Sequence, residues 1–274
     1  MEKLIIDLQD MPVTAIKEMD LHHLVDVMLE NIGNTNPNLR ENTCGAFHRL
    51  VDEAILENED CRRVFATCFE DSHLFNGIGS TAEDSVFYRS FSSLVITIIL
   101  GADSKRCFLS QDQYAFSLNK SFDYMDQEVD RRGYVTGKGW AHAIAHGADM
   151  LCSFVEHPRF DIAFTEDVLK SIKPHLTYEN RYTDGEESRL ASVVPALLNK
   201  GAKADVVQYW ISGLSPVSKA APYTDKYYKN VCATHNLEYF LKSLYIMLES
   251  KSENEGLSAY ILQFLQTIWS WASD

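Results

Sequence analysis

Apolar residues recur at intervals of three and four along almost the whole chain, and convincing alternation of apolar and polar residues is absent. This spacing places the apolar side chains on one face of a helix. The 13 glycines and 7 prolines fall mainly between the periodic segments. The pattern therefore predicts an all-α fold, with helices near residues 15–31, 40–57, 60–73, 83–101, 110–131, 138–155, 159–173, 186–200, 203–213, 226–250 and 256–272.

Several of these predicted helices carry the residues expected at their ends. Asp84, Thr165 and Asp184 stand at or near the beginning of apolar periodic segments. Asp and Thr side chains are favoured there because they accept hydrogen bonds from the free N–H groups of a first helical turn. Gly101 and Gly201 follow strongly periodic segments. Since glycine readily adopts the left-handed conformation that ends a helix, we expect helices to stop at both.

Four of the helical segments share a polar first turn followed by a strongly apolar run. They begin at residues 84, 137, 184 and 231, so their starts are 53, 47 and 47 residues apart. A helix pair of about that length is typical of HEAT and armadillo repeats, which stack into a curved α-α superhelix with a concave surface. An irregular helical bundle is the alternative. The spacing predicts one solenoid-like domain over 1–274, with less typical helices in 1–80, a core in 80–250 and a capping helix in 251–274 that ends near Trp269 and Trp271.

Alignment of the four segments by their starts puts a polar residue at the fifth position after each start. These residues are Arg89, His142, Arg189 and Asn236. Equivalent positions on successive inner helices of a solenoid point the same way, so the four side chains could line one groove. The alternative is that they satisfy unpaired backbone groups near the helix ends or face solvent.

Composition narrows the classes of partner. The net charge is −14 and the isoelectric point is near 5.0, which argues against a nucleic-acid partner because phosphates would be repelled. The six cysteines are scattered among apolar helical residues and form no CxxC pair, which is typical of reduced intracellular proteins. The N-terminus does not have the pattern of a signal peptide, and the longest purely apolar run is far shorter than a membrane span. We therefore expect a cytoplasmic protein without a membrane partner.

The stretch RRGYVTGKGWAHAIAHGADML, residues 131–151, concentrates the polar chemistry of the chain. His142, His146 and Asp149 are spaced i, i+4 and i+7, so a continuous helix would place them on one face, where they could bind a divalent metal. The zinc-hydrolase signature HExxH requires a glutamate where Ala143 stands. The alternative is that one histidine bonds a neighbouring helix, while small alanines let that helix approach closely.

The glycines of the same stretch suggest a second kind of site. Gly133, Gly137 and Gly139 do not have the spacing of a phosphate-binding P-loop, and the preceding segment is helical rather than a strand. A looser anion site remains, because glycines expose backbone N–H groups ahead of a helix and Arg132 and Lys138 are close in sequence. The alternative is a tight turn in which the glycines adopt positive φ angles.

This stretch also carries a family resemblance. Together with DSVFYRSFSSLVITIIL before it, and GEESRLASVVPALL and NLEYFLKSLYIML after it, it resembles a bacterial family, mainly from Gram-positive species, that is known only as a domain of unknown function. The resemblance covers roughly residues 80–250 and centres on the pattern RGYxxGKGWxHxxAHxADxL. It implies no activity, cofactor or substrate, so no catalytic role follows from it.

The residues then favour a cytoplasmic binding module with a polar concave groove that recognises a protein segment or a small anionic ligand. The alternative is a metal- or His-dependent hydrolase that uses His142, His146 and Asp149; the sequence implies no cofactor, although these residues could hold a divalent metal. No motif identifies a reaction. The candidate ligand-binding residues are Arg89, Arg132, Lys138, Trp140, His142, His146, Asp149, Glu187 and Arg189.

Overall fold

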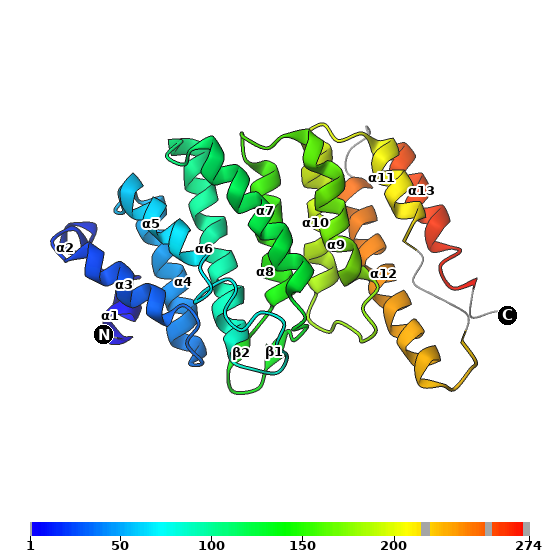
Figure 1. Ribbon diagram of the computed structural model, residues 1–274, viewed down its shortest axis with the longest axis horizontal. Coiled ribbons are helices and arrows are strands. Elements are labelled where there is room, and N and C mark those ends of the chain that lie inside the picture. Colours follow the sequence, from blue (N-terminus) through cyan, green and yellow to red (C-terminus); the bar gives the residue numbers. More distant parts are fainter. Residues whose placement is uncertain (1, 215–219, 250–253, 271–274) are drawn as a thin grey trace. The chain divides into compact units, whose positions relative to one another are not determined.

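The computed structural model describes residues 2–214, 220–249 and 254–270 (Figure 1). The chain divides into two compact units, Met1–Arg159 and Phe160–Asp274. Helices make up almost all of the regular structure in the described residues, which confirms the predicted all-α class. The prediction that the helix pairs continue as one superhelical domain over 1–274 concerns both units together and stays a prediction.

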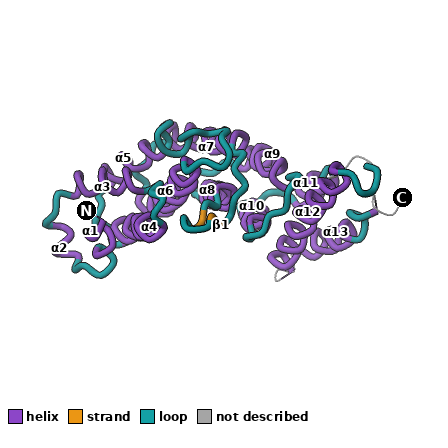
Figure 2. The backbone as a smooth tube through the Cα atoms, turned by 90° about the horizontal axis from the view of Figure 1, so that it is seen from below, coloured by secondary structure: helices purple, strands orange, loops and turns teal. Residues whose placement is uncertain are grey.

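The first unit is built in two layers of helices. Figure 2 shows α3, α5 and α7 along one side of the unit and α4, α6 and α8 along the other. Within the second layer, α6 packs against both α4 and α8. The elements of this unit are α1 (Glu2–Asp7), α2 (Val13–Lys17), α3 (Leu21–Asn31), α4 (Pro37–Asp52), α5 (Asn58–Cys68), α6 (Ser85–Arg106), α7 (Gln111–Gln127), β1 (Tyr134–Val135), β2 (Gly139–Trp140) and α8 (Ala143–Glu156).

The central helix of this unit is α6. It is the one described helix that is long and apolar enough to cross a membrane by length and composition, and 67% of its most apolar window is buried inside the protein. The predicted stop at Gly101 is wrong, because α6 continues for another turn to a left-handed cap at Cys107. Asp103 holds this last turn: its buried carboxylate accepts hydrogen bonds from the Leu109 N–H at 2.7 Å and the Arg159 guanidinium at 2.6 Å.

Small residues bring α8 close to its neighbours. Ala145 and Ala148 are buried on α8, as their role in close helix packing predicts. Gly147 permits the closest approach, since a Cβ atom there would lie 2.6 Å from the Met125 sulfur and 2.9 Å from a ring carbon of Tyr124 on α7. The hydroxyl of Tyr124 donates to the Ala143 carbonyl at 3.1 Å, which joins α7 to the first turn of α8.

The second unit places α10 and α12 side by side, with α9 against both and α13 against α11 and α12. The predicted helix near 159–173 starts six residues too early, because α9 begins at Thr165, where the sequence has its start signal; the stop near Gly201, which has φ +100°, is confirmed. The indole N–H of Trp269 donates to Glu238 of α12 at 3.1 Å, whereas Trp271 lies outside the described residues. The elements are a 3-10 turn (Ile162–Phe164), α9 (Thr165–Leu176), α10 (Glu186–Asn199), α11 (Ala204–Ser212), α12 (Asp225–Glu249) and α13 (Glu255–Leu265).

All six cysteines lie in the described part of the chain, and none of them forms a disulfide there. Cys61, Cys68 and Cys232 are buried, as expected for cysteines that act as small apolar residues. Cys107 differs, because it is exposed at the left-handed cap of α6. The interpretation of all six cysteines as lying among apolar helical residues is therefore wrong for Cys107.

Candidate functional site

The glycine-rich stretch forms a short antiparallel hairpin, which the sequence did not predict. Tyr134 pairs with Trp140 and Val135 with Gly139, and Lys138 N–H donates to the Val135 carbonyl at 2.9 Å. These are the only strands in the described residues. Gly137 and Gly139 have φ angles of +77° and +76°, which supports the predicted role of these glycines in a tight turn.

The hairpin also moves the start of the following helix. The predicted start at residue 138 is wrong, since α8 begins at Ala143. Two further hydrogen bonds extend the hairpin, from the Ala141 N–H to the Gly133 carbonyl at 2.8 Å and from the His142 N–H to the Arg132 carbonyl at 3.1 Å. His142 therefore stands just before the helix in a left-handed conformation, with φ +48°, rather than on a helical face with His146.

A fully buried arginine from α4 holds the hairpin in place. The Arg40 guanidinium donates to the carbonyls of Lys138 at 2.7 Å and Trp140 at 3.3 Å, and it lies 4.2 Å from the centre of the Phe87 ring. Gly139 allows this approach, because a Cβ atom there would lie 3.2 Å from Arg40 Nη2 and 2.9 Å from Pro37 Cβ. No sequence pattern connects Arg40 with the hairpin, because the two are about 100 residues apart along the chain.

The basic residues of the stretch are engaged by acidic partners. Lys138 Nζ lies 2.6 and 2.7 Å from the two carboxylate oxygens of Asp84. The Arg132 guanidinium contacts the buried Asp130 carboxylate at 2.6 Å and donates to the Glu83 carbonyl at 2.6 Å. Both cations therefore fix the hairpin to neighbouring segments of the unit. Their pairing leaves the predicted anion site with little uncompensated positive charge.

Arg89 is also structural in its contacts. It is fully buried on α6 and forms a two-pronged ion pair with the buried Glu128, at 2.6 and 3.0 Å. It also donates to the Asn76 carbonyl at 2.8 Å and the Ser85 hydroxyl at 3.0 Å. Burial by itself would lower the pKa of Arg89, but the hydrogen bond and charge of Glu128 raise it above its usual value. A ligand cannot reach this guanidinium in the structure.

The outer face of the hairpin presents three rings, which we call the aromatic platform: Tyr134, Trp140 and His142. The Trp140 and His142 rings stack with their centres 4.5 Å apart and their planes at 15°, and Tyr134 meets Trp140 edge-on at 5.1 Å. Tyr134 and Trp140 are 57% and 41% exposed. Exposed aromatic rings on a backbone fixed by buried contacts are typical of binding surfaces.

His146 lies beneath this platform and is nearly buried. Its Nδ1 is 2.8 Å from the Ser90 hydroxyl oxygen, its ring meets Phe91 edge-on, and its ring centre is 5.6 Å from that of His142. Ser90 is fully buried and donates to the Ala141 carbonyl. A serine placed in this way joins α6 to α8 and does not face a substrate, so the pair has the geometry of a structural contact between helices.

The predicted metal ligands are only partly brought together. His142 and His146 are neighbours, and Asp149 follows one turn later on α8. Within the described residues, no group of three or more His, Cys, Asp or Glu side chains is arranged so that it could hold a metal ion. The distortion at His142 explains the difference, because the i, i+4, i+7 spacing places side chains on one face only within a continuous helix.

Glu187 and Arg189 lie in the second unit, on α10. Arg189 is exposed, whereas Glu187 is buried and lines a pocket of about 470 Å³ together with Tyr239 of α12. Burial raises the pKa of the Glu187 carboxyl. Asn236, the corresponding residue of α12, is buried and donates to the Asn180 carbonyl at 2.8 Å.

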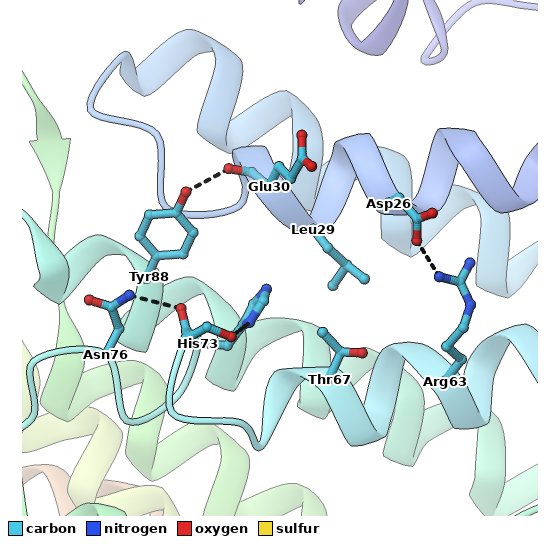
Figure 3. Close-up of a pocket in the computed structure, with 9 residues that line it drawn as sticks. Asp26, Leu29, Glu30, Arg63, Thr67, His73, Asn76 and Tyr88 are labelled. Atoms are coloured by element: carbon cyan, nitrogen blue, oxygen red, sulfur yellow. Dashed lines mark hydrogen bonds and ion pairs between the residues drawn. The ribbon is translucent and has the colours of Figure 1, made fainter.

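A pocket in the first unit has no counterpart in the sequence analysis. We call it the α3–α5 pocket; it has a volume of about 590 Å³, and Figure 3 shows its walls. Its residues come from three helices and one loop, so no local motif could reveal it. They are Asp26, Leu29 and Glu30 of α3, Arg63 and Thr67 of α5, Ser72, His73 and Asn76 of the next loop, and Tyr88 of α6.

Comparison with known proteins places the chain in a family. Residues 74–246 match the family described as Protein of unknown function (DUF2785). No curated protein and no solved structure matches the chain. The matched region contains α6, the hairpin and α8, whereas most of the α3–α5 pocket precedes it. Because the match spans more than half of the chain, the protein belongs to the DUF2785 family of proteins of unknown function.

Proposed function

We propose that the protein is a binding module whose aromatic platform recognises a segment of another protein that carries lysine or arginine side chains. The observation that carries this proposal is the combination of exposure and rigidity in the hairpin. Trp140 is 41% exposed, yet its own carbonyl and that of Lys138 accept hydrogen bonds from the fully buried Arg40. Preorganised aromatic rings lose little conformational entropy when they bind a partner.

The surroundings of the platform favour a basic partner segment. The faces of tryptophan and tyrosine rings attract lysine and arginine cations. The chain has a net charge of −14, which would draw such a segment to the surface. Glu41 on α4 is also close enough to His142 to interact with it electrostatically, so it lies near the platform. Partial burial raises the pKa of the Glu41 carboxyl, whereas its interactions with Arg40 and His142 oppose that rise. An anionic ligand would meet Lys138 and Arg132 already paired with Asp84 and Asp130.

Two wider aspects of the proposal concern the whole chain. The two-layer packing of α3 to α8 supports a HEAT-like stacking of helix pairs, in which the platform would lie beside a groove. The composition and the scattered free cysteines support a cytoplasmic location. The hydrolase alternative has less support, because His142 stands before α8 rather than on its face and, within the described residues, no group of three or more His, Cys, Asp or Glu side chains is arranged to hold a metal ion.

The test uses Trp140 itself as the reporter. The chain has four tryptophans, so incorporation of 5-fluorotryptophan gives few fluorine resonances, and that of Trp140 is assigned by the Trp140→Phe variant. We expect a lysine- and arginine-rich peptide to shift the Trp140 resonance saturably, and a glutamate-rich peptide of equal length to leave it unchanged. A resonance that responds to neither peptide would contradict the proposal.

A second measurement separates the platform from general charge attraction. Trp140→Ala leaves the net charge of the protein unchanged but removes the stacked ring. Because a cation–π contact with tryptophan contributes about 1–2 kcal/mol, the affinity for the basic peptide should fall roughly tenfold. Trp140→Phe should retain most of the affinity. If Trp140→Ala binds the peptide as tightly as the wild type, the attraction is merely electrostatic and the platform is not the binding site.

A further inference from the structure

The pocket beside Glu187 in the second unit brings two opposite charges together. We call it the α10–α12 pocket, because its walls come from the loop before α10, the first turn of α10 and α12. Its volume of about 470 Å³ lies in the range of small-molecule sites. Arg181 and Glu187 are the charged residues among those that line it. All of its lining lies within the region that matches the DUF2785 family, residues 74–246.

Buried hydrogen bonds fix the backbone on both sides of Arg181. The Asn236 side chain, which is 1% exposed on α12, donates to the Tyr178 carbonyl at 3.1 Å and to the Asn180 carbonyl at 2.8 Å. It also accepts a hydrogen bond from the Tyr182 N–H at 3.1 Å. The loop that carries Arg181 is therefore held in place, while Arg181 itself stays exposed. A cation on a fixed backbone loses less conformational entropy when it binds a ligand.

Glu187 places a carboxyl in the same pocket from the first turn of α10. The residue is only 6% exposed, and its carboxyl accepts a hydrogen bond from its own backbone N–H. Burial raises the pKa of this carboxyl, and the Arg181 guanidinium opposes that rise from a distance, since no ion pair joins the two side chains in the described part of the chain. Glutamate is seldom buried to this extent without a paired cation, which indicates a missing positive partner.

The two charges together select a ligand that carries both signs. A simple anion would be attracted by Arg181 but repelled by the Glu187 carboxylate, and a simple cation would meet the opposite pair of forces. A neutral ligand would leave the buried Glu187 carboxylate without a counter-charge, which is unfavourable. A zwitterion instead places an ammonium against Glu187 and a carboxylate against Arg181, and both contacts are charge-assisted hydrogen bonds.

From this arrangement we infer that the α10–α12 pocket binds a free α-amino acid in its zwitterionic form. Arg181 and Glu187 are close enough to interact electrostatically, which suits a ligand whose ammonium and carboxylate are attached to one carbon. Tyr239 of α12, which is 49% exposed, lines the same pocket and offers a ring for an apolar or aromatic side chain. The site lies wholly in the second unit, so this inference and the proposal for the aromatic platform do not depend on each other.

The probes for this inference are the standard amino acids, tested one at a time on the full-length protein by saturation-transfer NMR and calorimetric titration. We expect at least one amino acid with an apolar or aromatic side chain to bind saturably with a millimolar or lower dissociation constant. Its N-acetyl derivative lacks the ammonium and its amide lacks the carboxylate, so each should bind about tenfold more weakly or worse, the effect of one lost charge-assisted hydrogen bond. If no amino acid binds at millimolar concentrations, or if either derivative binds as tightly as its parent, the inference is overturned.

Two variants locate the binding site. Arg181→Gln removes the cation from an exposed position, so it should leave the fold intact and weaken amino-acid binding about tenfold. Glu187→Gln keeps the shape of the side chain and should weaken binding to a similar extent. Arg189→Gln on α10 is the matched control, because it removes the same charge from another exposed arginine of the second unit that does not line the pocket, and it should bind the amino acid as the wild type does. If Arg181→Gln or Glu187→Gln binds as tightly as Arg189→Gln, the amino acid lies elsewhere and the inference is overturned.

Discussion

Replacement of Arg89 by methionine should destabilise the first unit more than any other single substitution in the hairpin region. Both members of the Arg89–Glu128 pair are fully buried, and two hydrogen bonds of 2.6 and 3.0 Å join them. Arg89→Met leaves the Glu128 carboxylate buried without its counter-charge, which costs about 3–5 kcal/mol in comparable cases. The Asn76 carbonyl also loses a donor at 2.8 Å, and an unsatisfied buried carbonyl costs about 1–3 kcal/mol. Since these two effects overlap, we expect the free energy of unfolding to fall by about 4 kcal/mol.

The double variant Arg89→Met/Glu128→Leu separates charge from packing. Removal of both charges relieves the buried carboxylate, and buried ion pairs can often be replaced by apolar side chains with little loss. The double variant should therefore be more stable than Arg89→Met by about 2 kcal/mol or more. The unsatisfied loop carbonyls, and the Asp130 N–H that loses its Glu128 acceptor at 2.8 Å, should keep it below the wild type. This non-additivity is the signature of a direct interaction between the two side chains.

Urea denaturation measures both variants, provided that the signal reports on the first unit. Trp140 is the only tryptophan in residues 1–159, so a background in which Trp210, Trp269 and Trp271 are replaced by phenylalanine makes its fluorescence such a probe. Far-UV circular dichroism on the same samples follows both units. A loss below about 1 kcal/mol for Arg89→Met, or a double variant as unstable as the sum of the single variants, would refute the reasoning.

Three further outcomes are expected from individual residues. Gly139→Ala should destabilise the protein more than Gly137→Ala. Both glycines have φ near +76°, but only at Gly139 would the new Cβ atom meet a neighbouring side chain, Pro37 Cβ at 2.9 Å. Equal decreases in the melting temperature of the two variants would contradict this. Alkylation followed by mass spectrometry should modify the exposed Cys107 first and spare Cys44, whose pKa burial raises to about 12; a faster reaction at Cys44 would be inconsistent with the structure. Burial lowers the pKa of His73 below 6.5, so the unfolded chain binds a proton more readily than the folded chain. The free energy of unfolding should therefore decrease as the pH falls below about 6.5. If it decreases equally steeply in a His73→Gln variant, His73 is not the cause.

The helices were predictable because each buries one face. The 3.6-residue periodicity locates α3 to α13, but several predicted ends differ from the observed ones by five to seven residues, and it fails where a local exception occurs. Gly101 was expected to end a helix, but α6 continues because the buried Asp103 holds the next turn through Leu109 and Arg159. The hairpin escaped detection because strands of two residues are too short to show an alternating pattern.

The candidate site was harder to predict because its geometry depends on contacts between distant segments. The sequence identifies Lys138 as a candidate for anion binding, but it does not reveal that Asp84, 54 residues earlier, neutralises it. Arg40 could not be recognised at all, since its hydrogen bonds reach residues 98 and 100 positions away. Whether the charge of a residue such as Lys138 is free to bind a ligand thus depends on its partners in the folded chain and cannot be read from the local motif.

The polar residues that recur at the fifth position of the aligned segments illustrate the same distinction. Arg89 donates to the carbonyls of Asn76 and Gly77, which precede α6, and Asn236 donates to the carbonyls of Tyr178 and Asn180. Arg89 in the first unit and Asn236 in the second therefore each donate hydrogen bonds to the backbone of a loop. This agrees with the alternative that such residues satisfy unpaired backbone groups rather than line a groove. Such a residue recurs because each loop needs hydrogen-bond donors, so its recurrence is evidence of folding rather than of binding. Exposed rings such as Trp140 satisfy no such requirement, and this contrast is the reason for placing the binding surface on the hairpin.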